Sequence, residues 1–147
     1  MFEIKFLVFV FGLVFGSFCN VLIARLPIEK DFIFERSKCP HCNHTLQARH
    51  LIPLLSFIFQ KGNCSFCQKR ISIQYPLIEF FIGSIFLGCS LHFQSIGSQL
   101  YFAFYFSILL VLFIIDYKHY ILPNVLVGSL LILSIYPLIY QPYVSSL

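Results

Sequence analysis

Apolar residues in this chain are gathered into four long runs, and a long polar segment separates the first run from the second. The runs cover about residues 4–24, 76–93, 99–115 and 122–140. A helix of about 20 apolar residues crosses the roughly 30 Å hydrocarbon core of a bilayer, and the runs approach or reach that length. Pro76 opens the second run, and the first turn of a helix tolerates proline. The pattern predicts an all-α polytopic membrane protein with about four transmembrane helices.

The composition supports this fold class. Hydrophobic residues make up 59% of the chain and charged residues 11%, whereas charged residues make up roughly 25% of soluble domains. The net charge of +4 is weak evidence for nucleic-acid binding. We therefore expect the lipid bilayer, and no nucleic acid, as a partner.

The first run has two interpretations. Lys5 precedes the apolar run, as a basic residue does in a secretory signal. The run stays apolar through residues 21–24, past any sensible cleavage point, and this favours a retained helix. Gly12 and Gly16 would give that helix a smooth face for close contact with another helix, although chance glycines would look the same.

The long polar segment, residues 25–75, indicates the orientation. It holds eight of the ten Lys and Arg against three acids. An excess of Lys and Arg in a short loop is typical of the cytoplasmic side, so we expect this loop in the cytoplasm and both termini outside. The eight basic residues are Arg25, Lys30, Arg36, Lys38, Arg49, Lys61, Lys69 and Arg70.

Four cysteines in this loop form two Cys-x-x-Cys pairs, separated by 21 residues. Each pair can place two thiolates on one metal ion, and two pairs complete the tetrahedral site of structural zinc. Two disulfides are the alternative, but a reducing cytosol disfavours them. Softness and geometry alone do not separate zinc from another thiophilic metal. We expect a small zinc-ribbon-like loop whose ligands are Cys39, Cys42, Cys64 and Cys67.

One stretch of the loop, residues 51–59, is apolar but too short to span a bilayer, and Pro53 interrupts it. We expect it either to lie on the membrane surface or to pack under the metal knuckles, which are the tight turns formed by the two Cys-x-x-Cys pairs.

Two acids lie at membrane level, where an ionisable side chain is costly and its default interpretation is functional. Glu79 begins the second helix and Asp116 ends the third, both on the side of the polar loop. Two carboxylates that share a proton can activate water, one as the base and the other as the acid. Asp116 could instead merely end its helix beside Lys118. His119 and His92 are weaker candidates.

The order of motifs resembles the bacterial prepilin leader peptidase/N-methyltransferase family. The resemblance begins with Gly16-Ser-Phe-Cys-Asn20 and continues through the first Cys-x-x-Cys and Ile52-Pro-Leu-Leu-Ser56. Gly62-x-Cys-x-x-Cys, Tyr75-Pro-Leu-Ile-Glu79 and Asp116-Tyr-Lys-His-Tyr-Ile-Leu-Pro-Asn124 follow in the family's order and spacing.

The resemblance implies an intramembrane aspartic peptidase of the bacterial inner membrane. Family members use two aspartates to cleave the leaders of type IV prepilins and pseudopilins on the cytoplasmic face. Many then methylate the new N-terminus with S-adenosylmethionine. Asp116 would be the first catalytic aspartate, the four cysteines the zinc ligands, and Glu79 a residue linked to methyl transfer. Residues 1–93 would form the N-terminal region, and residues 94–147 the start of the aspartic peptidase domain, without its C-terminal part.

The sequence departs from the family at several positions. The family's second aspartate follows in a Gly-x-Gly-Asp motif, but no Asp or Glu follows Asp116 here. Leu51 and Ile82 stand where the family has Asn and Thr. We expect a truncated or split peptidase, or a remnant. Glu79, a second copy or another chain would then supply the missing carboxylate. A non-catalytic zinc module that binds pilin-like substrates or a partner, and a methyltransferase without peptidase activity, are the alternatives.

Overall fold

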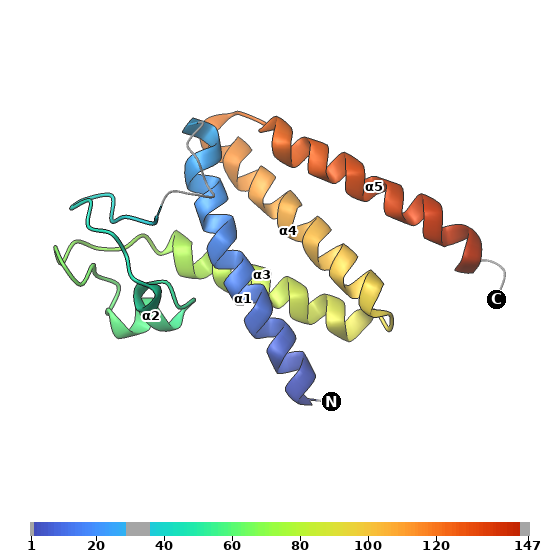
Figure 1. Cartoon of the computed structure of the whole chain (residues 1–147), viewed down its shortest axis with the longest axis horizontal. Coiled ribbons are helices and arrows are strands. Elements are labelled where there is room, and N and C mark those ends of the chain that lie inside the picture. The colour runs from blue at the N-terminus through green and yellow to red at the C-terminus, as the bar shows by residue number, and fades with distance from the viewer. Residues whose placement is uncertain (1, 29–35, 145–147) are drawn as a thin grey trace.

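The protein is a bundle of long helices with a loop at one side (Figure 1). A computed structural model describes residues 2–28 and 36–144. The elements, in chain order, are α1 (Phe2–Arg25), η1 (Leu26–Ile28), η2 (Ala48–His50), α2 (Leu55–Phe59), α3 (Gln74–His92), α4 (Ile96–His119) and α5 (Asn124–Val144).

Each predicted apolar run is a helix. Among the described residues, three helices are long and apolar enough to cross a membrane, over Glu3–Ile28, Gln74–His92 and Ile96–His119. The fourth run is α5, whose described apolar part is Asn124–Ile135. The predicted all-α polytopic membrane protein is therefore confirmed, with three helices of spanning length and a fourth apolar helix, α5, of 21 residues.

The third helix extends further than the hydrophobic pattern predicted. α4 continues past Asp116 and ends at Tyr120, whose φ of 53° is left-handed. The N–H of Tyr120 donates to the carbonyl of Asp116 at 2.8 Å, a bond that satisfies one of the last carbonyls of the helix. Asp116 therefore lies on the last helical turn and does not end the helix.

Glycines bring α1 and α3 into close contact. A Cβ on Gly12 would lie 2.8 Å from the Cα of Gly83, and a Cβ on Gly16 would lie 2.8 Å from the Cα of Glu79. Real Cβ atoms do not approach other atoms this closely, so only glycine permits this crossing. The predicted smooth face of the first helix is confirmed, and it places Glu79 directly against α1.

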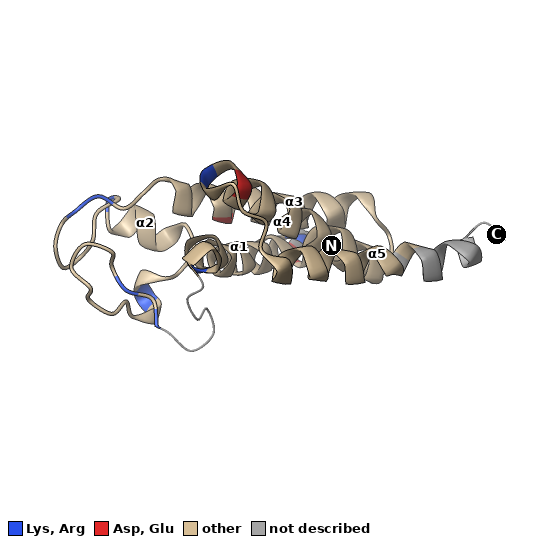
Figure 2. Cartoon of the chain, turned by 90° about the horizontal axis from the view of Figure 1, so that it is seen from above, with Lys and Arg blue, Asp and Glu red and all other residues tan. Residues whose placement is uncertain are grey.

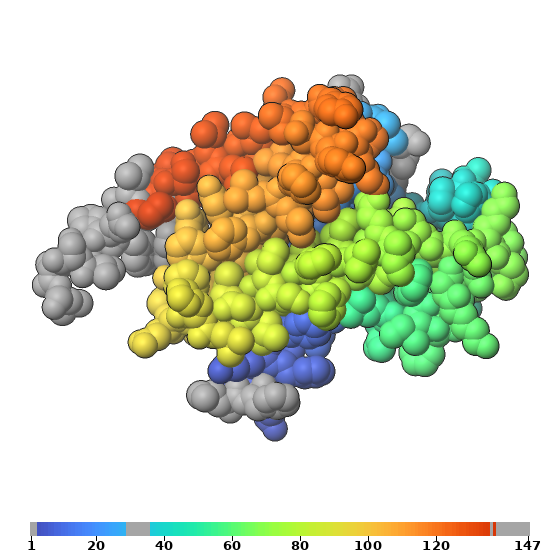
Figure 3. Space-filling view, turned by 180° about the vertical axis from the view of Figure 1, so that it is seen from behind, coloured from blue at the N-terminus to red at the C-terminus, as the bar shows by residue number. Residues whose placement is uncertain are grey.

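The core lies where α1, α3 and α4 meet. Phe86 of α3 is buried, and its ring packs edge-on against Phe104 of α4 at a centroid distance of 5.4 Å. Phe15 of α1 completes this aromatic cluster, 5.0 Å from Phe104. Figure 3 shows α3 and α4 side by side across one face of the molecule, with the start of α1 visible below them and its end beside the end of α4. α5 begins beside the end of α4 and leads away from the other helices (Figure 1).

Candidate functional site: a cysteine cluster over a carboxylate-lined cavity

The two Cys-x-x-Cys pairs fold into two equivalent knuckles. In the first, the N–H of Cys39 donates to the carbonyl of His44 at 3.0 Å, and the N–H of Asn43 donates to the carbonyl of Cys39 at 2.9 Å. The second knuckle has the corresponding bonds 25 residues later, from Cys64 to Lys69 and from Gln68 to Cys64. Asn43 and Gln68, which follow the second cysteine of each pair, both have a positive φ, 55° and 57°.

The knuckles bring the four predicted ligands together. The Sγ atoms of Cys39, Cys42, Cys64 and Cys67 all lie within 4.8 Å of one another, and Cys39 Sγ and Cys67 Sγ are 3.9 Å apart. Sulfur ligands about 2.3 Å from a tetrahedral zinc ion lie about 3.8 Å apart. None of the six cysteines in the described residues forms a disulfide. The cluster can hold one metal ion, and the thiolate set is consistent with zinc.

Local backbone donors prepare one of these thiols for metal binding. Hydrogen bonds from the backbone N–H groups of Cys67 and Phe66 lower the pKa of Cys64 to about 7. Because the thiolate is the form that binds metal, this lowered pKa favours metal binding by Cys64.

An aromatic stack joins the two knuckles. The His44 ring, from the first knuckle, lies 3.6 Å from the Phe66 ring of the second, with an angle of 30° between their planes. The His50 ring also packs edge-on against the Phe66 ring, at a centroid distance of 5.4 Å. These rings could not be predicted from the sequence, because nothing in their spacing distinguishes them from other loop residues.

Glu79 connects the loop to the helices. It is buried, and its Oε2 accepts a hydrogen bond from the N–H of Leu54 at 2.9 Å. Leu54 has φ 59° and ψ −49°, and the N–H of Leu55 donates across it to the carbonyl of Pro53 at 2.6 Å. This is a γ-turn with positive φ, a rare and strained conformation. The Ser17 side chain on α1 is a second hydrogen-bonding group for the same carboxylate. Glu79 thus holds a strained turn of the loop against the place where α1 and α3 cross.

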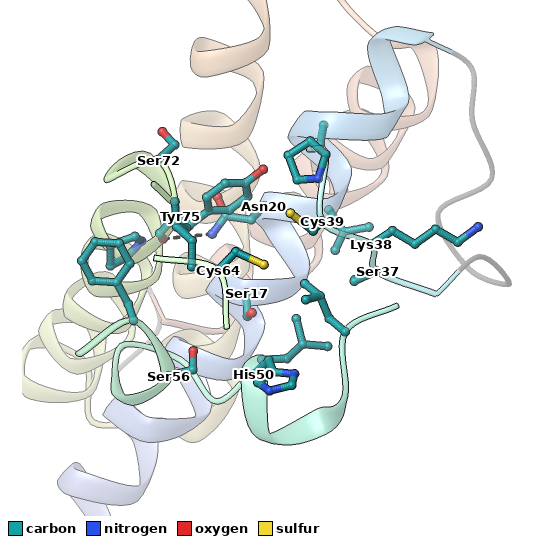
Figure 4. A pocket seen from close by; sticks show the side chains of 18 of the residues that line it. Ser17, Asn20, Ser37, Lys38, Cys39, His50, Ser56, Cys64, Ser72 and Tyr75 are labelled. Carbon is teal, nitrogen blue, oxygen red and sulfur yellow. Dashed lines mark hydrogen bonds between the residues drawn. The ribbon is translucent and has the colours of Figure 1, made fainter. Parts of the chain in front are cut away.

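Asn20, one helical turn beyond Ser17, is also buried. Its Nδ2 donates to the carbonyl of Tyr75 at 3.0 Å, as drawn in Figure 4. Its Oδ1 is buried and has no hydrogen-bond partner among the described residues. Buried polar atoms are nearly always paired, so this oxygen is available to accept a hydrogen bond from a ligand in the neighbouring cavity, which Asn20 lines. Asn20 belongs to the motif that carries the family resemblance, but its side-chain role could not be read from the sequence.

A cavity of about 630 Å³ lies between the knuckles and the two helices (Figure 4). Its volume falls within the range of roughly 300–1,000 Å³ that is typical of small-ligand sites. Polar side chains from α1 and α3 line one side, and two of the clustered cysteines line another. These residues are Ser17, Asn20, Glu79, Cys39 and Cys64.

Asp116 lies outside this cavity. It is exposed on the last turn of α4 and lines neither this cavity nor a second one of about 280 Å³. The same turn is joined to the start of α3, because the Lys118 ammonium donates to Gln74 Oε1. Glu79 and Asp116 therefore lie at the same end of the bundle, as predicted, but their pairing as two catalytic carboxylates stays a prediction.

The two weaker histidine candidates lie at opposite ends of the helix bundle. His119 lines the second cavity together with Asn20 and Lys118. His92 ends α3 at the opposite end of the bundle, where its ring packs edge-on against Phe93. His92 is thus an ordinary helix-end residue, and His119 is near the site without a hydrogen bond or ring contact described for it.

Comparison with known proteins agrees with this arrangement. Residues 10–93 match the family described as the bacterial peptidase A24 N-terminal domain. The prepilin leader peptidase/N-methyltransferase of Bacillus subtilis (strain 168) is 39% identical over 119 residues, which are 80% of this chain and 48% of the relative. The namesake in Myxococcus xanthus (strain DK1622) is 40% identical over 115 residues, 78% of this chain and 34% of the relative.

A third relative has a different name. The type 4 prepilin-like proteins leader peptide-processing enzyme of Escherichia coli O78:H11 is 36% identical over 138 residues, 82% of this chain and 51% of the relative. The chain spans about half or less of the length of these three relatives, and no solved structure matches it. The matched residues include the cysteine cluster, the glycines at which α1 crosses α3, and Glu79. This chain therefore belongs to the bacterial peptidase A24 N-terminal domain family.

Proposed function

We propose that this chain acts in the processing of prepilin-like proteins at the bacterial inner membrane. Residues 1–93 would form the N-terminal region, with the zinc loop and the cavity, and residues 94–147 would begin the aspartic peptidase region, with Asp116. The relatives' names join a leader peptidase to an N-methyltransferase. The observation that carries the proposal is the position of Glu79, a buried carboxylate that lines a cavity covered by the cysteine knuckles.

Methyl transfer suits this cavity. An N-terminal amine must lose a proton to act as a nucleophile, and a positioned carboxylate can accept that proton. Ser17 and Asn20 add two polar groups beside Glu79, which suits the N–H donors of an amine. S-adenosylmethionine would supply the electrophilic methyl group when bound. The volume of about 630 Å³ is suited to a ligand of this class.

Leader cleavage is the second part of the proposal, and it rests on Asp116. Its carboxylate is exposed at the end of α4 that lies beside the start of α3, where a substrate in the loop-side leaflet would reach it. A second carboxylate would come from Glu79, from a second copy of this chain, or from another chain. Four thiolates holding one structural zinc ion would keep the loop folded above the site.

Charge removal at Glu79 tests the methyl-transfer proposal. Glu79→Gln keeps an oxygen that can accept the Leu54 N–H but removes the base. We expect methylation of a pre-cut pilin-like peptide to fall by about 10²-fold or more, since general base catalysis contributes roughly 10²–10⁴-fold. Mass spectrometry of the peptide N-terminus, with bound zinc as the folding check, measures this.

Glu79→Ala is the matched variant, because it also leaves the Leu54 N–H without its acceptor. That loss costs about 1–3 kcal/mol and should loosen the loop as well as abolish methylation. Full methylation by Glu79→Gln together with a defective Glu79→Ala would show that Glu79 only holds the loop.

The orientation is proposed from the charges of the loop. The described part of the loop, residues 36–73, carries six Lys and Arg and no Asp or Glu, and Figure 2 shows blue segments without red ones there. Such a loop favours the cytoplasmic side.

Thiol labelling in intact cells tests this orientation. We expect a membrane-impermeant reagent to label Gln94→Cys, in the turn between α3 and α4, and to leave Ala48→Cys unlabelled until the cells are permeabilised. Both positions are exposed, and neither is a metal ligand. The unsubstituted chain gives the background from the native cysteines. Labelling of Ala48→Cys in intact cells would place the loop outside and refute the proposed orientation.

A further inference from the structure

The short helix α2 has an apolar face that no described residue covers. Leu55, Ile58 and Phe59 are 51%, 65% and 80% exposed. Residues three and four apart share one face of a helix, so these three side chains form a single outward patch. The opposite face, with Ser56, Phe57 and Gln60, lines the cavity.

The depth of α2 follows from its attachment to Glu79. The N–H of Leu54, immediately before α2, is bonded to the Glu79 carboxylate. Glu79 lies five residues into α3 from Gln74, which is about 7.5 Å along the helix at 1.5 Å per residue. Because α3 is apolar enough to span a bilayer, α2 begins below the surface at which that span starts. A helix that lies in the interface buries its apolar face by about 5–10 Å.

Basic residues flank the outward patch. Arg49 precedes it in η2 and Lys61 follows α2, and both are exposed. No acid lies between residues 36 and 78. An apolar patch with Lys and Arg beside it suits the boundary between acyl chains and anionic headgroups.

We propose that α2 is an interfacial anchor, with Leu55, Ile58 and Phe59 inserted into the acyl region of the loop-side leaflet and Arg49 and Lys61 at its phosphates. Its inner face then forms a wall of the cavity while its outer face is held by lipid. The anchor fixes the loop beside the α1–α3 crossing at two places, through the Leu54–Glu79 bond and through the bilayer. This inference depends on the placement of α2 and does not require the chain to act on prepilins.

The chain contains no Trp, so one introduced indole reports its own surroundings. Phe59→Trp and Leu55→Trp place it on the patch. Phe66→Trp is a matched control on a knuckle, where Phe66 is 43% exposed. The variants are reconstituted in vesicles of phosphatidylethanolamine and phosphatidylglycerol, with or without a dibrominated phospholipid. We expect bromolipid to quench the two patch indoles several-fold more strongly than the control, and aqueous iodide to quench the control more strongly.

Zinc content is checked first, so that only folded loops are compared; Leu55→Trp serves if Phe59→Trp does not fold. Equal bromolipid quenching of patch and control indoles would overturn the proposal. A second result would also overturn it. If the patch indoles are shielded from both quenchers at high protein density but become exposed to iodide when the protein is diluted into more lipid, then a second copy of the chain covers α2.

Discussion

Replacing Cys64 with Ser is expected to lower bound zinc from about one ion per chain to little or none, because three remaining thiolates hold a structural ion poorly. Cys64 is buried among the four sulfurs and carries the thiol with the lowered pKa. Atomic absorption on the purified chain measures the metal. Cys42→Ser should behave in the same way.

The loss of metal should unfold the loop and leave the helices inserted. Structural zinc contributes about 10–16 kcal/mol to the folding of zinc-finger peptides, and the two knuckles are otherwise joined mainly by the His44–Phe66 stack. Limited proteolysis should therefore cut Cys64→Ser within residues 36–73 and spare α1 and α3. Cys89→Ala is the matched control, since this buried cysteine lies in α3, far along the chain from the cluster. Unchanged zinc in Cys64→Ser would rule out a four-thiolate site.

The helices were predictable because a bilayer imposes length and hydropathy on any segment that crosses it. The paired Cys-x-x-Cys spacing likewise predicted the cluster, since two such turns determine which atoms can converge. Gly12 and Gly16 predicted a close contact, but not that α3 would be the partner. Hydrogen bonds between residues far apart in the sequence were harder to predict. No spacing rule pairs Leu54 with Glu79, and the bond depends on how the loop folds back.

The end of α4 and the apolar stretch of the loop show another limit. Hydropathy places a span's end at the first charged residue, but the backbone continued past Asp116 until Tyr120 adopted a left-handed conformation. The stretch 51–59 was expected either on the membrane surface or under the knuckles. Its helix has two faces, and one of them lines the cavity that Cys39 and Cys64 also line. The choice between the two alternatives stays a prediction, because the outer face has no described partner.

The purified 147-residue chain is expected not to cleave a prepilin leader detectably. Attack of water on a peptide bond needs a base and a proton donor together, and one carboxylate cannot be in both states at once. Asp116 is exposed and lines neither cavity. Glu79 is buried, and its carboxylate is occupied by the Leu54 N–H. Glu79 and Asp116 thus differ in surroundings, since only Glu79 lines the cavity, and we expect them not to share a proton.

The assay follows a pilin-like peptide, reconstituted with the chain in vesicles, by mass spectrometry of the released leader. Adding a polypeptide that supplies a second membrane-level aspartate should restore cleavage, and Asp116→Asn should abolish the restored activity. Because Asn keeps the shape of the Asp side chain and can still form hydrogen bonds, a loss of activity in Asp116→Asn reports the need for the carboxylate itself. Efficient cleavage by the chain alone that Asp116→Asn abolishes would mean that Glu79 or a second copy completes the pair, and Glu79→Gln separates these two. Cleavage that survives Asp116→Asn would remove the aspartic mechanism, because no acid follows Asp116 in these 147 residues.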